Sequence, residues 1–193
     1  MRSSLSLPEV ELIVIDESFL DFSGLESAMN LVPRAPNLVV VKSLGKSLGW
    51  HGVRLGYAAM NPRAADLLRS QLPFWNVNGL AAYILKSLSE FKEEFLQSLA
   101  LVAKDRTYMM NQLERVPELR VFASKANFLY VELPPEVPGR KLRDRLLEEY
   151  GLMVRECSNK IGSSERYLRL AVQRKEAVDL LVQALSRELT LRQ

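Results

Sequence analysis

The sequence predicts an α/β protein with a mostly parallel sheet, followed by a small α+β domain. Three observations support this fold class. Residues 1–78 hold short apolar strands between loops and brief helices, a pattern typical of buried parallel strands. Residues 79–116 carry apolar side chains at helical spacing. Residues 117–193 alternate strand-like and helix-like segments, which predicts a compact small domain.

The first part contains three short apolar runs that predict strands. We expect these strands at Val10–Ile15, Leu38–Val41 and Leu55–Met60. The strand pattern stops at Pro62, and proline is well tolerated at the first helical position, where its missing N–H costs nothing. A helix is therefore predicted over Arg63–Gln71.

The second and third parts are predicted from periodicity and from one proline. Leu80, Ile84 and Leu88 recur at helical spacing, and Pro117 is expected to end the helical region. Beyond it, strand and helix patterns alternate. The expected segments are Asn127–Leu133, Gly139–Tyr150, Leu152–Glu156, Arg166–Val172 and Lys175–Leu191.

Composition indicates a globular protein without a nucleic-acid or membrane partner. The 193 residues are 48% hydrophobic, enough to bury a core, and 26 basic against 23 acidic residues give a net charge of only +3. The basic residues are not gathered with aromatics as a nucleic-acid groove requires. No apolar run is long enough to span a membrane and no signal peptide is visible, so a cytoplasmic location is expected. The single cysteine, Cys157, excludes an internal disulfide and a cysteine-rich metal site, and no metal is expected.

Residues 38–57 carry the most specific chemical pattern. An apolar strand is followed by Ser43, Lys46 and Arg54, with three glycines between them. A lysine amine can form an imine with a phosphate-bearing aldehyde cofactor, while a hydroxyl and a guanidinium hold the phosphate. Glycines let the backbone approach such a ligand closely. The alternative is a solvated lysine at a strand end beside an ordinary surface arginine.

The same letters invite a nucleotide-binding interpretation. Gly45-Lys46-Ser47 after a strand matches the end of a phosphate-binding P-loop. That motif requires another glycine five residues before Gly45, and the residue there is Val40. A valine inside an apolar strand does not supply the open backbone that cradles nucleotide phosphates, so this interpretation is set aside.

This segment resembles the fold-type I pyridoxal-phosphate enzymes of the aminotransferase class I/II family. There it reads S-x-x-K followed by G-x-R-x-G-Y, and here Ser43 to Lys46 and Gly52 to Tyr57 match that pattern. The resemblance implies that Lys46 is the catalytic lysine that binds pyridoxal 5'-phosphate. It also implies that Ser43 and Arg54 hold the cofactor phosphate.

Asp16 ends an upstream apolar strand, at the edge where open α/β sheets bind their ligands. The resemblance implies that it pairs with the pyridine nitrogen and favours electron withdrawal by the ring. Taken alone, an acid that caps the next helix is the alternative. Phe19 replaces a tyrosine that bonds the cofactor ring oxygen in many relatives, so it is assigned to the cofactor site without that hydrogen bond.

Two arginines in the small domain are the expected substrate-binding residues. Residues 126–131, 154–159 and 167–172 resemble strands of the family's small domain. By that match Arg169 binds the substrate carboxylate and Arg155 contacts its distal phosphate. The alternative is that both are polar residues on the solvent face of an antiparallel sheet.

The only histidine, His51, stands five residues after Lys46 and next to Trp50. Imidazole titrates near neutral pH, so a general-base role is conceivable. In pyridoxal-phosphate chemistry the lysine itself moves the proton, so a packing or supporting role is favoured. Trp50 is expected to be a wall of the pocket.

The resemblance implies a pyridoxal-phosphate-dependent lyase or transaminase acting on a phosphorylated amino acid. Phe19 favours an enzyme like L-threonine-O-3-phosphate decarboxylase of cobalamin biosynthesis, with histidinol-phosphate transaminase or another class I/II aminotransferase as alternatives. The match covers the carboxyl-terminal half of the family, so the first part is expected to be a partial large domain. The expected assembly is a homodimer or a pairing with a missing amino-terminal half, and residues 73–78 resemble a segment near the family's dimer interface. A catalytically inactive truncated fragment is a further alternative.

Overall fold

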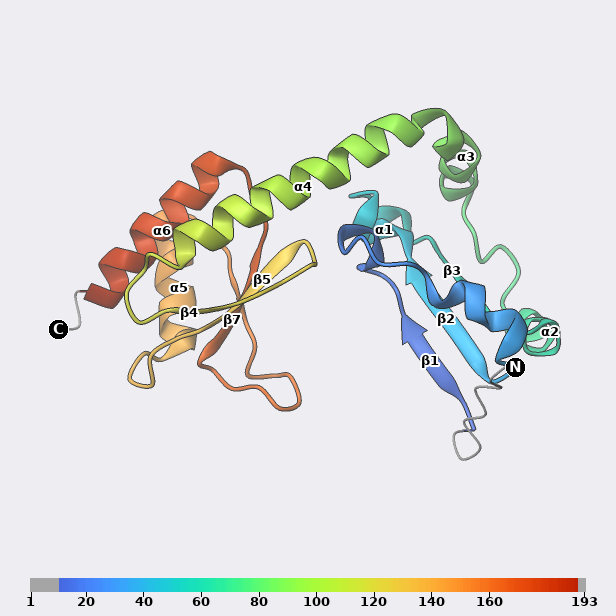
Figure 1. The fold of residues 1–193 in the computed structure, drawn as a ribbon, viewed down its shortest axis with the longest axis horizontal. Helices are drawn as coiled ribbons and strands as arrows, with labels where there is room; N and C mark the ends of the chain where they lie inside the picture. The colour runs from blue at the N-terminus through green and yellow to red at the C-terminus, as the bar shows by residue number, and fades with distance from the viewer. Residues whose placement is uncertain (1–10, 191–193) are drawn as a thin grey trace, which may run out of the picture. The chain divides into compact units, whose positions relative to one another are not determined.

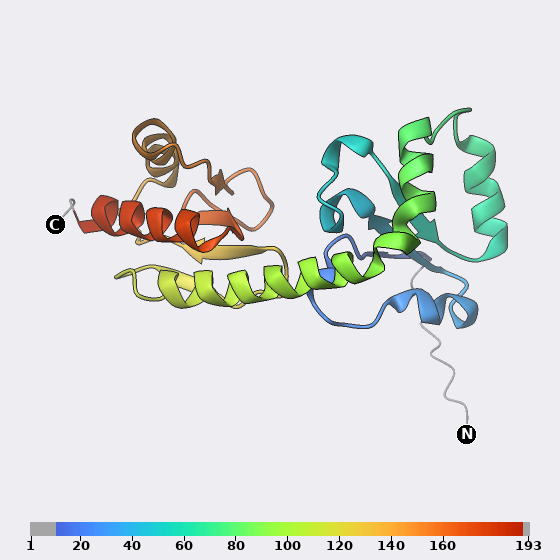
Figure 2. The ribbon, with the colours of Figure 1, turned by 90° about the horizontal axis from the view of Figure 1, so that it is seen from above.

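The computed structural model describes residues 11–190, which form two compact units. Unit 1 extends to Gln97 and unit 2 begins at Ser98, within one long helix. Each unit has its own β-sheet and its own helices (Figures 1 and 2). The three-part division at residues 78 and 116 stays a prediction. No helix among residues 11–190 is both long and apolar enough to cross a bilayer.

Unit 1 is built on a three-stranded sheet with the order β1-β2-β3 (Figure 1). Short 3-10 helices, written η, and the one-turn helix α1 connect its strands, and longer α-helices follow the third strand. In chain order the elements are β1 (Ile13–Asp16), η1 (Leu20–Phe22), η2 (Ala28–Arg34), β2 (Leu38–Ser43), α1 (Leu44–Ser47), η3 (His51–Val53), β3 (Gly56–Ala59), α2 (Pro62–Gln71), α3 (Gly79–Ser87), η4 (Leu88–Phe91) and the start of α4 (Lys92–Leu113).

The sheet of unit 1 is mixed rather than wholly parallel. β1 and β2 pair in parallel, as predicted, whereas β3 pairs antiparallel to β2 with Gly56 opposite Ser43. The intervening segment, which contains α1 and η3, returns to the carboxyl end of β2, where the N–H of Leu44 donates to the carbonyl of Leu55 at 3.0 Å. A parallel return would need a crossover that carries the chain to the other end of the sheet.

Two asparagines fix the starts of the helices that follow. Asn61 precedes α2 and accepts a hydrogen bond from the N–H of Ala64 at 3.0 Å, with Pro62 at the first helical position. Asn78 precedes α3 and accepts from the N–H of Ala81 at 2.8 Å. The predicted helix at 63–71 is therefore found. The predicted helical region at 79–116 is present as α3, η4 and α4, and α4 ends at Leu113.

The strands of unit 1 are less buried than predicted. Val40 in the middle of β2 is fully buried, but Val14 of β1 is 56% exposed and three of the four residues of β3 are exposed. β1 alternates half-buried and exposed positions, so one of its faces is uncovered. The prediction of buried strands is wrong for β1 and β3, because they lie at the two edges of this small sheet. Val10 lies outside the described residues.

Unit 2 is an antiparallel sheet with helices. The strand order is β4-β5-β7-β6, and the three pairings are all antiparallel. Figures 1 and 2 show α4, α5 and α6 beside these strands. The elements that follow α4 are β4 (Arg120–Phe122), β5 (Phe128–Glu132), α5 (Gly139–Tyr150), β6 (Arg155–Glu156), β7 (Tyr167–Ala171) and α6 (Lys175–Thr190).

The core of unit 2 is one continuous cluster of apolar side chains. Leu129 and Leu168 point from β5 and β7 into this core, and Leu146 and Leu185 meet them from α5 and α6. Each of the four is no more than 1% exposed. Because side chains alternate along a strand, the residues between these core positions lie on the opposite face of the sheet. That face carries the predicted substrate-binding arginines.

The predicted segments of unit 2 are found with shorter strands. The strand expected at 127–133 is β5, and that expected at 152–156 shrinks to the two residues of β6, an edge strand. β4 was not predicted. α6 covers the predicted helix to Thr190, and Leu191 lies outside the described residues.

Candidate active site

The predicted cofactor residues of unit 1 lie at the carboxyl ends of β1 and β2. Asp16 is the last residue of β1, and Ser43 is the last residue of β2. The two strands are parallel neighbours, so their carboxyl ends meet at one edge of the sheet. That edge is where ligands bind in open α/β sheets. Along the chain, η1, η2 and their loops separate Asp16 from Ser43. The parallel pairing of β1 with β2 brings the two residues to the same edge.

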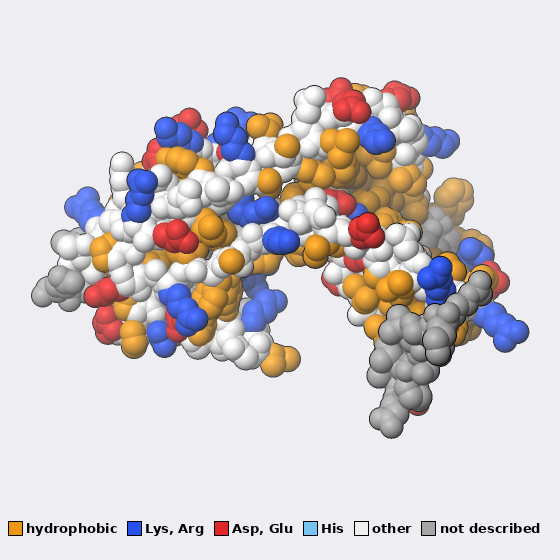
Figure 3. Space-filling model, viewed as in Figure 1, with side chains coloured by type: hydrophobic (Ala, Val, Ile, Leu, Met, Phe, Trp, Pro, Cys, Tyr) orange, Lys and Arg blue, Asp and Glu red, His pale blue; other side chains and the backbone are white. Residues whose placement is uncertain are grey.

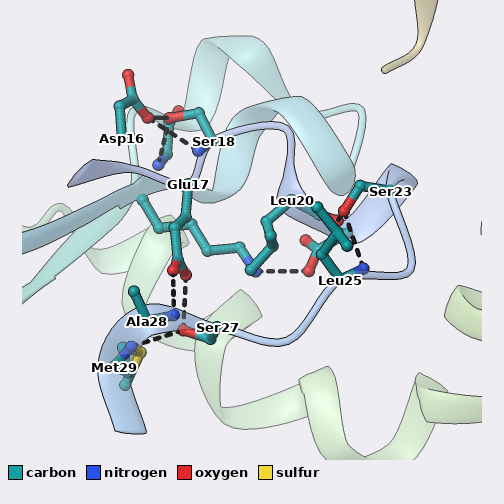
Figure 4. A network of polar contacts seen from close by, with 12 residues as sticks. Asp16, Glu17, Ser18, Leu20, Ser23, Leu25, Ser27, Ala28 and Met29 are labelled. Atoms are coloured by element: carbon teal, nitrogen blue, oxygen red, sulfur yellow. Dashed lines mark hydrogen bonds and ion pairs between the residues drawn. The ribbon is translucent and has the colours of Figure 1, made fainter. Parts of the chain in front are cut away.

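Asp16, Ser18 and Ser43 form one chain of hydrogen bonds (Figure 4). Oδ1 of Asp16 accepts from the N–H of Ser18 at 2.8 Å and from its hydroxyl at 2.5 Å. The same hydroxyl accepts from the N–H of Ser43 at 3.1 Å. Within residues 11–190, Oδ2 of Asp16 forms no hydrogen bond, so one carboxylate oxygen is held while the other is open.

These contacts also set the charge of Asp16. The side-chain hydrogen bond from Ser18 lowers the pKa of Asp16 most, and the backbone hydrogen bond from Ser18 lowers it further. Desolvation opposes the shift, and the positive charge of Lys46 adds to it. The pKa of this carboxyl therefore lies below its ordinary value, and Asp16 is an anion at neutral pH.

Lys46 lies in the short helix α1 with its amine beside an aromatic ring. Its Nζ is 5.5 Å from the centroid of the Phe19 ring, and no hydrogen bond or ion pair of this amine is found within residues 11–190. Lys42, four residues earlier, is different, because its Nζ is bound to Asp21 at 2.5 Å in a largely buried pair. Of these two lysines, only Lys46 has an amine that is available to react.

Tight backbone packing surrounds Lys46. A Cβ on Gly45 would lie 3.3 Å from the carbonyl oxygen of Trp50, so a side chain there would crowd the following loop. Arg54 adopts the left-handed conformation with φ 58° and ψ 54°, and its Nη1 donates to the carbonyl of His51 at 3.1 Å. Such a conformation costs a non-glycine residue of order 1–3 kcal/mol, and it is often found at functional sites. Arg54 stands two residues before Gly56, the pairing partner of Ser43.

One buried polar atom next to Lys46 lacks a partner among residues 11–190. Oγ of Ser47 is buried and forms no hydrogen bond within that range. A buried hydroxyl without a partner is unusual, because the loss of its hydration is not compensated. The available groups at this edge are a lysine amine, a carboxylate oxygen, hydroxyls and a guanidinium. This set is chemically suited to pyridoxal 5'-phosphate, whose aldehyde, ring nitrogen and phosphate would each meet a matching group.

Sequence reasoning missed Ser18 and Glu17. Glu17 is buried and points to the other side of the strand from Asp16 (Figure 4), where it accepts from the hydroxyl of Ser27 at 2.7 Å and the N–H of Ala28 at 2.6 Å. These bonds anchor the start of η2. The available signal was the spacing of Ser18, because an aspartate often accepts hydrogen bonds from the residue two positions later.

Arg155 and Arg169 are brought together within unit 2. They are direct partners in the β6–β7 pairing, and both are exposed on the face opposite the core. The guanidinium of Arg169 lies 5.1 Å from the centroid of the Phe128 ring. The side chain of Arg155 forms no hydrogen bond or ion pair with residues 11–190. Two like charges directly opposite each other destabilise a sheet, so this pair favours an anionic ligand.

Arg155 also borders a cavity of about 430 Å³ at the edge of the sheet. The other lining residues are mostly basic or polar. They are Arg140, Arg143, Val154, Glu156, Ser158 and Asn159. Arg140 is engaged there, since its Nη2 donates to the hydroxyl of Ser158 at 3.0 Å. Arg155 is thus the one guanidinium in this cavity without such a contact among residues 11–190.

The remaining candidates have subordinate places. The side chain of His51 is exposed, which contradicts a packing role, whereas the supporting role stays a prediction; its carbonyl accepts from Arg54. Trp50 is 47% exposed. Cys157 is buried, and burial raises the pKa of its thiol, which makes it unreactive. Among residues 11–190, no three His, Cys, Asp or Glu side chains converge as metal ligands do.

Comparison with known proteins identifies a family. The model of the family described as aminotransferase class I and II matches residues 11–185. An L-serine phosphate decarboxylase of Sulfurospirillum multivorans is 33% identical over 181 residues, which cover 90% of this chain and 46% of that protein.

Solved structures agree with the sequence match. A histidinol-phosphate aminotransferase from Clostridium acetobutylicum has a TM-score of 0.86 at 26% identity, covering 93% of this chain and 55% of that one. An L-threonine-O-3-phosphate decarboxylase from Porphyromonas gingivalis has a TM-score of 0.83 at 26% identity, with the same two coverages. The chain spans about half of the length of these relatives.

Proposed function

Because the chain belongs to the aminotransferase class I and II family, we propose that it forms part of a pyridoxal-phosphate-dependent decarboxylase of a phosphorylated amino acid. The observation that carries this proposal is the free amine of Lys46 beside Asp16 and Ser43 at one edge of the sheet. This chemistry needs a reactive amine, an ionised carboxylate and a phosphate-binding site, which Lys46, Asp16 and Ser43 with Arg54 would supply.

Each cofactor residue would have one role. Lys46 would hold the cofactor covalently, and the open Oδ2 of Asp16 would pair with its ring nitrogen. Ser43 and Arg54 would bind its phosphate, and Phe19 would lie beside the ring without a hydrogen bond. When bound, pyridoxal 5'-phosphate supplies an electron sink for the negative charge that develops at the substrate's α carbon.

The two opposed arginines suggest the substrate class. An amino-acid phosphate carries a carboxylate and a phosphate, and the Arg155–Arg169 pair offers one guanidinium for each. Serine phosphate and threonine phosphate, named for two of the relatives, have both groups. Histidinol phosphate has no carboxylate, so the arginine pair fits serine or threonine phosphate better than it fits histidinol phosphate.

The chain's own residues then divide the work of the reaction. Arg169 binds and orients the carboxylate so that its bond to the α carbon is the one that breaks. Arg155 holds the phosphate and fixes the position of the substrate. After carbon dioxide leaves, Nζ of Lys46 delivers the proton that replaces it at the α carbon. In a transaminase the same amine would instead remove the α proton.

We further propose that unit 1 acts in a homodimer or together with an amino-terminal half, in the cytoplasm. The loop between α2 and α3 supports the first point, because Phe74 and Trp75 are 96% and 95% exposed. Figure 3 shows hydrophobic side chains gathered near α3 of unit 1 in this view. Large exposed aromatic side chains of this kind are typical of surfaces that another protein covers.

The test of the cofactor site is covalent trapping on the full chain. Pyridoxal 5'-phosphate is added, the mixture is reduced with borohydride, and the labelled peptide is mapped. We expect the label on Lys46, its loss in Lys46→Ala, and its retention in the matched control Lys42→Ala. Label spread over surface lysines, or label that survives in Lys46→Ala, would contradict the proposal.

Substrate choice is tested by release of carbon dioxide from L-serine phosphate and L-threonine phosphate. Arg169→Ala should lower kcat/KM about 100-fold, because a charge-assisted contact to the carboxylate is lost, while trapping on Lys46 persists. Arg69→Ala, an exposed arginine paired with Asp66, is the control and should change kcat/KM less than about twofold. Transamination without carbon dioxide release would assign the alternative activity.

A further inference from the structure

Ser18 occupies a position between the two halves of the proposed cofactor site. The residue is 8% exposed, and its hydroxyl connects the end of β1 to the end of β2. A serine hydroxyl has one proton to donate and lone pairs to accept with. Here the proton goes to Asp16, and a lone pair receives the N–H of Ser43, so both capacities are used.

The two hydrogen bonds on Asp16 fix its orientation. Ser18 donates from both its backbone and its side chain to the same oxygen, Oδ1. Rotation of the carboxylate would break both bonds, so Oδ2 stays directed away from them. Hydrogen bonds that run in sequence also polarise one another, and the Ser43 N–H therefore strengthens the donation from Ser18 to Asp16.

We propose that Ser18 is a positioning residue that couples Asp16 to Ser43. It fixes the distance between the carboxylate that would pair with the cofactor ring and the residue that would bind the cofactor phosphate. This inference rests on the proposed function, because the distance between Asp16 and Ser43 matters only if both residues bind the same cofactor. Ser18 itself touches neither the cofactor nor the substrate. It acts through Asp16, which it holds ionised with one oxygen open, and through the backbone of Ser43.

The neighbouring charges leave Ser18 as the main influence on Asp16. The groups that face the carboxyl are the donors of Ser18 and the amine of Lys46. Glu17 points to the other side of the strand, where its carboxylate accepts hydrogen bonds from Ser27 and Ala28. A matched control therefore exists in the chain, because Ser27 donates a similar hydroxyl bond of 2.7 Å to a carboxylate that has no part in the proposed site.

The test is a pH titration of the Asp16 carboxyl in the full chain without cofactor. Carbon-detected NMR measures the ionisation of this carboxyl at each pH. In Ser18→Ala the pKa of Asp16 should shift upward, because the largest stabilising contact of its anion is gone. Ser18→Thr keeps the hydroxyl and should restore the titration of the wild-type chain. Ser27→Ala should leave it unchanged. A purely structural role of Ser18 would not move this titration.

Two outcomes would overturn the inference. One is an Asp16 titration in Ser18→Ala that coincides with that of the wild-type chain. The other needs no variant, so it remains available if Ser18→Ala does not fold. In the wild-type chain, the chemical shift of the Ser18 amide should change as Asp16 ionises. A Ser18 amide shift that stays constant over this pH range would show that the hydrogen bond is absent. Trapping on Lys46 is independent of both measurements. Trapping that succeeds while the Asp16 titration does not move would reject the role of Ser18 and keep the proposed function.

Discussion

Unit 1 and unit 2 differ in how they treat apolar side chains. In unit 2, leucines from two strands and two helices meet in one continuous buried core. In the described part of unit 1, only four hydrophobic side chains are buried, although the unit is rich in them. Leu12, Val14, Phe74 and Trp75 are each more than half exposed. The unit that carries Lys46 is thus the one with the smaller core.

This difference indicates that buried apolar surface stabilises unit 2 more than unit 1. Each buried Å² of apolar surface contributes roughly 25 cal/mol, so an uncovered leucine or tryptophan contributes little until another surface covers it. Unit 2 has its stabilising surface already buried and can serve as a rigid support for Arg155 and Arg169. Unit 1 has its reactive groups in place but leaves apolar surface open, which is the physical reason to expect a partner there.

The largest effect expected is from a core leucine of unit 2. Leu168→Ala should lower the free energy of unfolding of unit 2 by about 2–5 kcal/mol, because Leu168 is fully buried and a cavity would remain. Leu12→Ala is the matched change in unit 1 and should cost less than about 0.5 kcal/mol, since Leu12 is 59% exposed. Hydrogen exchange of peptides covering each sheet measures the two units separately. Equal costs would abolish the distinction between the units.

A smaller effect is expected from ion pairs. Glu188 is fully buried, and its Oε1 accepts from Arg145 at 3.1 Å and from Tyr150 at 3.1 Å. Arg145→Ala should destabilise unit 2 by about 1–3 kcal/mol, because it leaves a buried carboxylate without its cation. Arg69→Ala removes a fully exposed pair in unit 1 and should cost less than about 0.5 kcal/mol.

The readout for this pair of variants is again hydrogen exchange, compared between peptides of α6 and α2. A loss of protection confined to α6 in Arg145→Ala would sharpen the contrast between the units. If Arg69→Ala weakened α2 as much as Arg145→Ala weakens α6, ion pairing would not distinguish them.

The smallest effect expected concerns pH and the Cys157 thiol. Burial raises its pKa above the ordinary 9.0, so the folded state holds the thiol proton more tightly than the unfolded state. The stability that this gives is present below the ordinary thiol pKa and is lost as the pH rises through it towards the folded pKa. Alkylation of Cys157 in the folded chain should therefore accelerate at a higher pH than in the same chain unfolded in urea.

Two tyrosines of unit 2, Tyr108 and Tyr150, act in the same direction. Hydrogen bonding to Asp179 raises the pKa of Tyr108, and burial raises that of Tyr150. The alkylation rate reports only Cys157 and so separates the thiol from them. Coincident pH profiles for the folded and urea-unfolded chains would show that the thiol is not shielded within unit 2.

Much of the fold was predictable because its signals are local. The strand and helix positions of β2, β5, α5 and α6 follow from apolar periodicity, and their observed bounds lie close to the predicted ones. The helix start at Pro62 was equally local. β4 was missed because a three-residue edge strand carries too little periodicity, and the bounds of β6 were overestimated for the same reason.

The candidate site was predictable to the extent that it depends on spacing along the chain. The intervals between Ser43, Lys46 and Arg54 are fixed by covalent structure, so the sequence indicated them directly. It did not indicate which lysine has a free amine. That depends on Asp21 of η1, which forms an ion pair with Lys42 and leaves Lys46 available.

By itself, then, the sequence determined the family, the fold class and the residues to suspect, because all of these are encoded in types and intervals. Only the tertiary structure decided that β3 runs antiparallel to β2, that Ser18 joins Asp16 to Ser43, and that Arg155 lies opposite Arg169. The physical reason is that strand direction and register arise from pairings between distant segments. A shift of one residue in such a pairing turns every side chain to the other face of the sheet, so no local pattern can fix which groups meet.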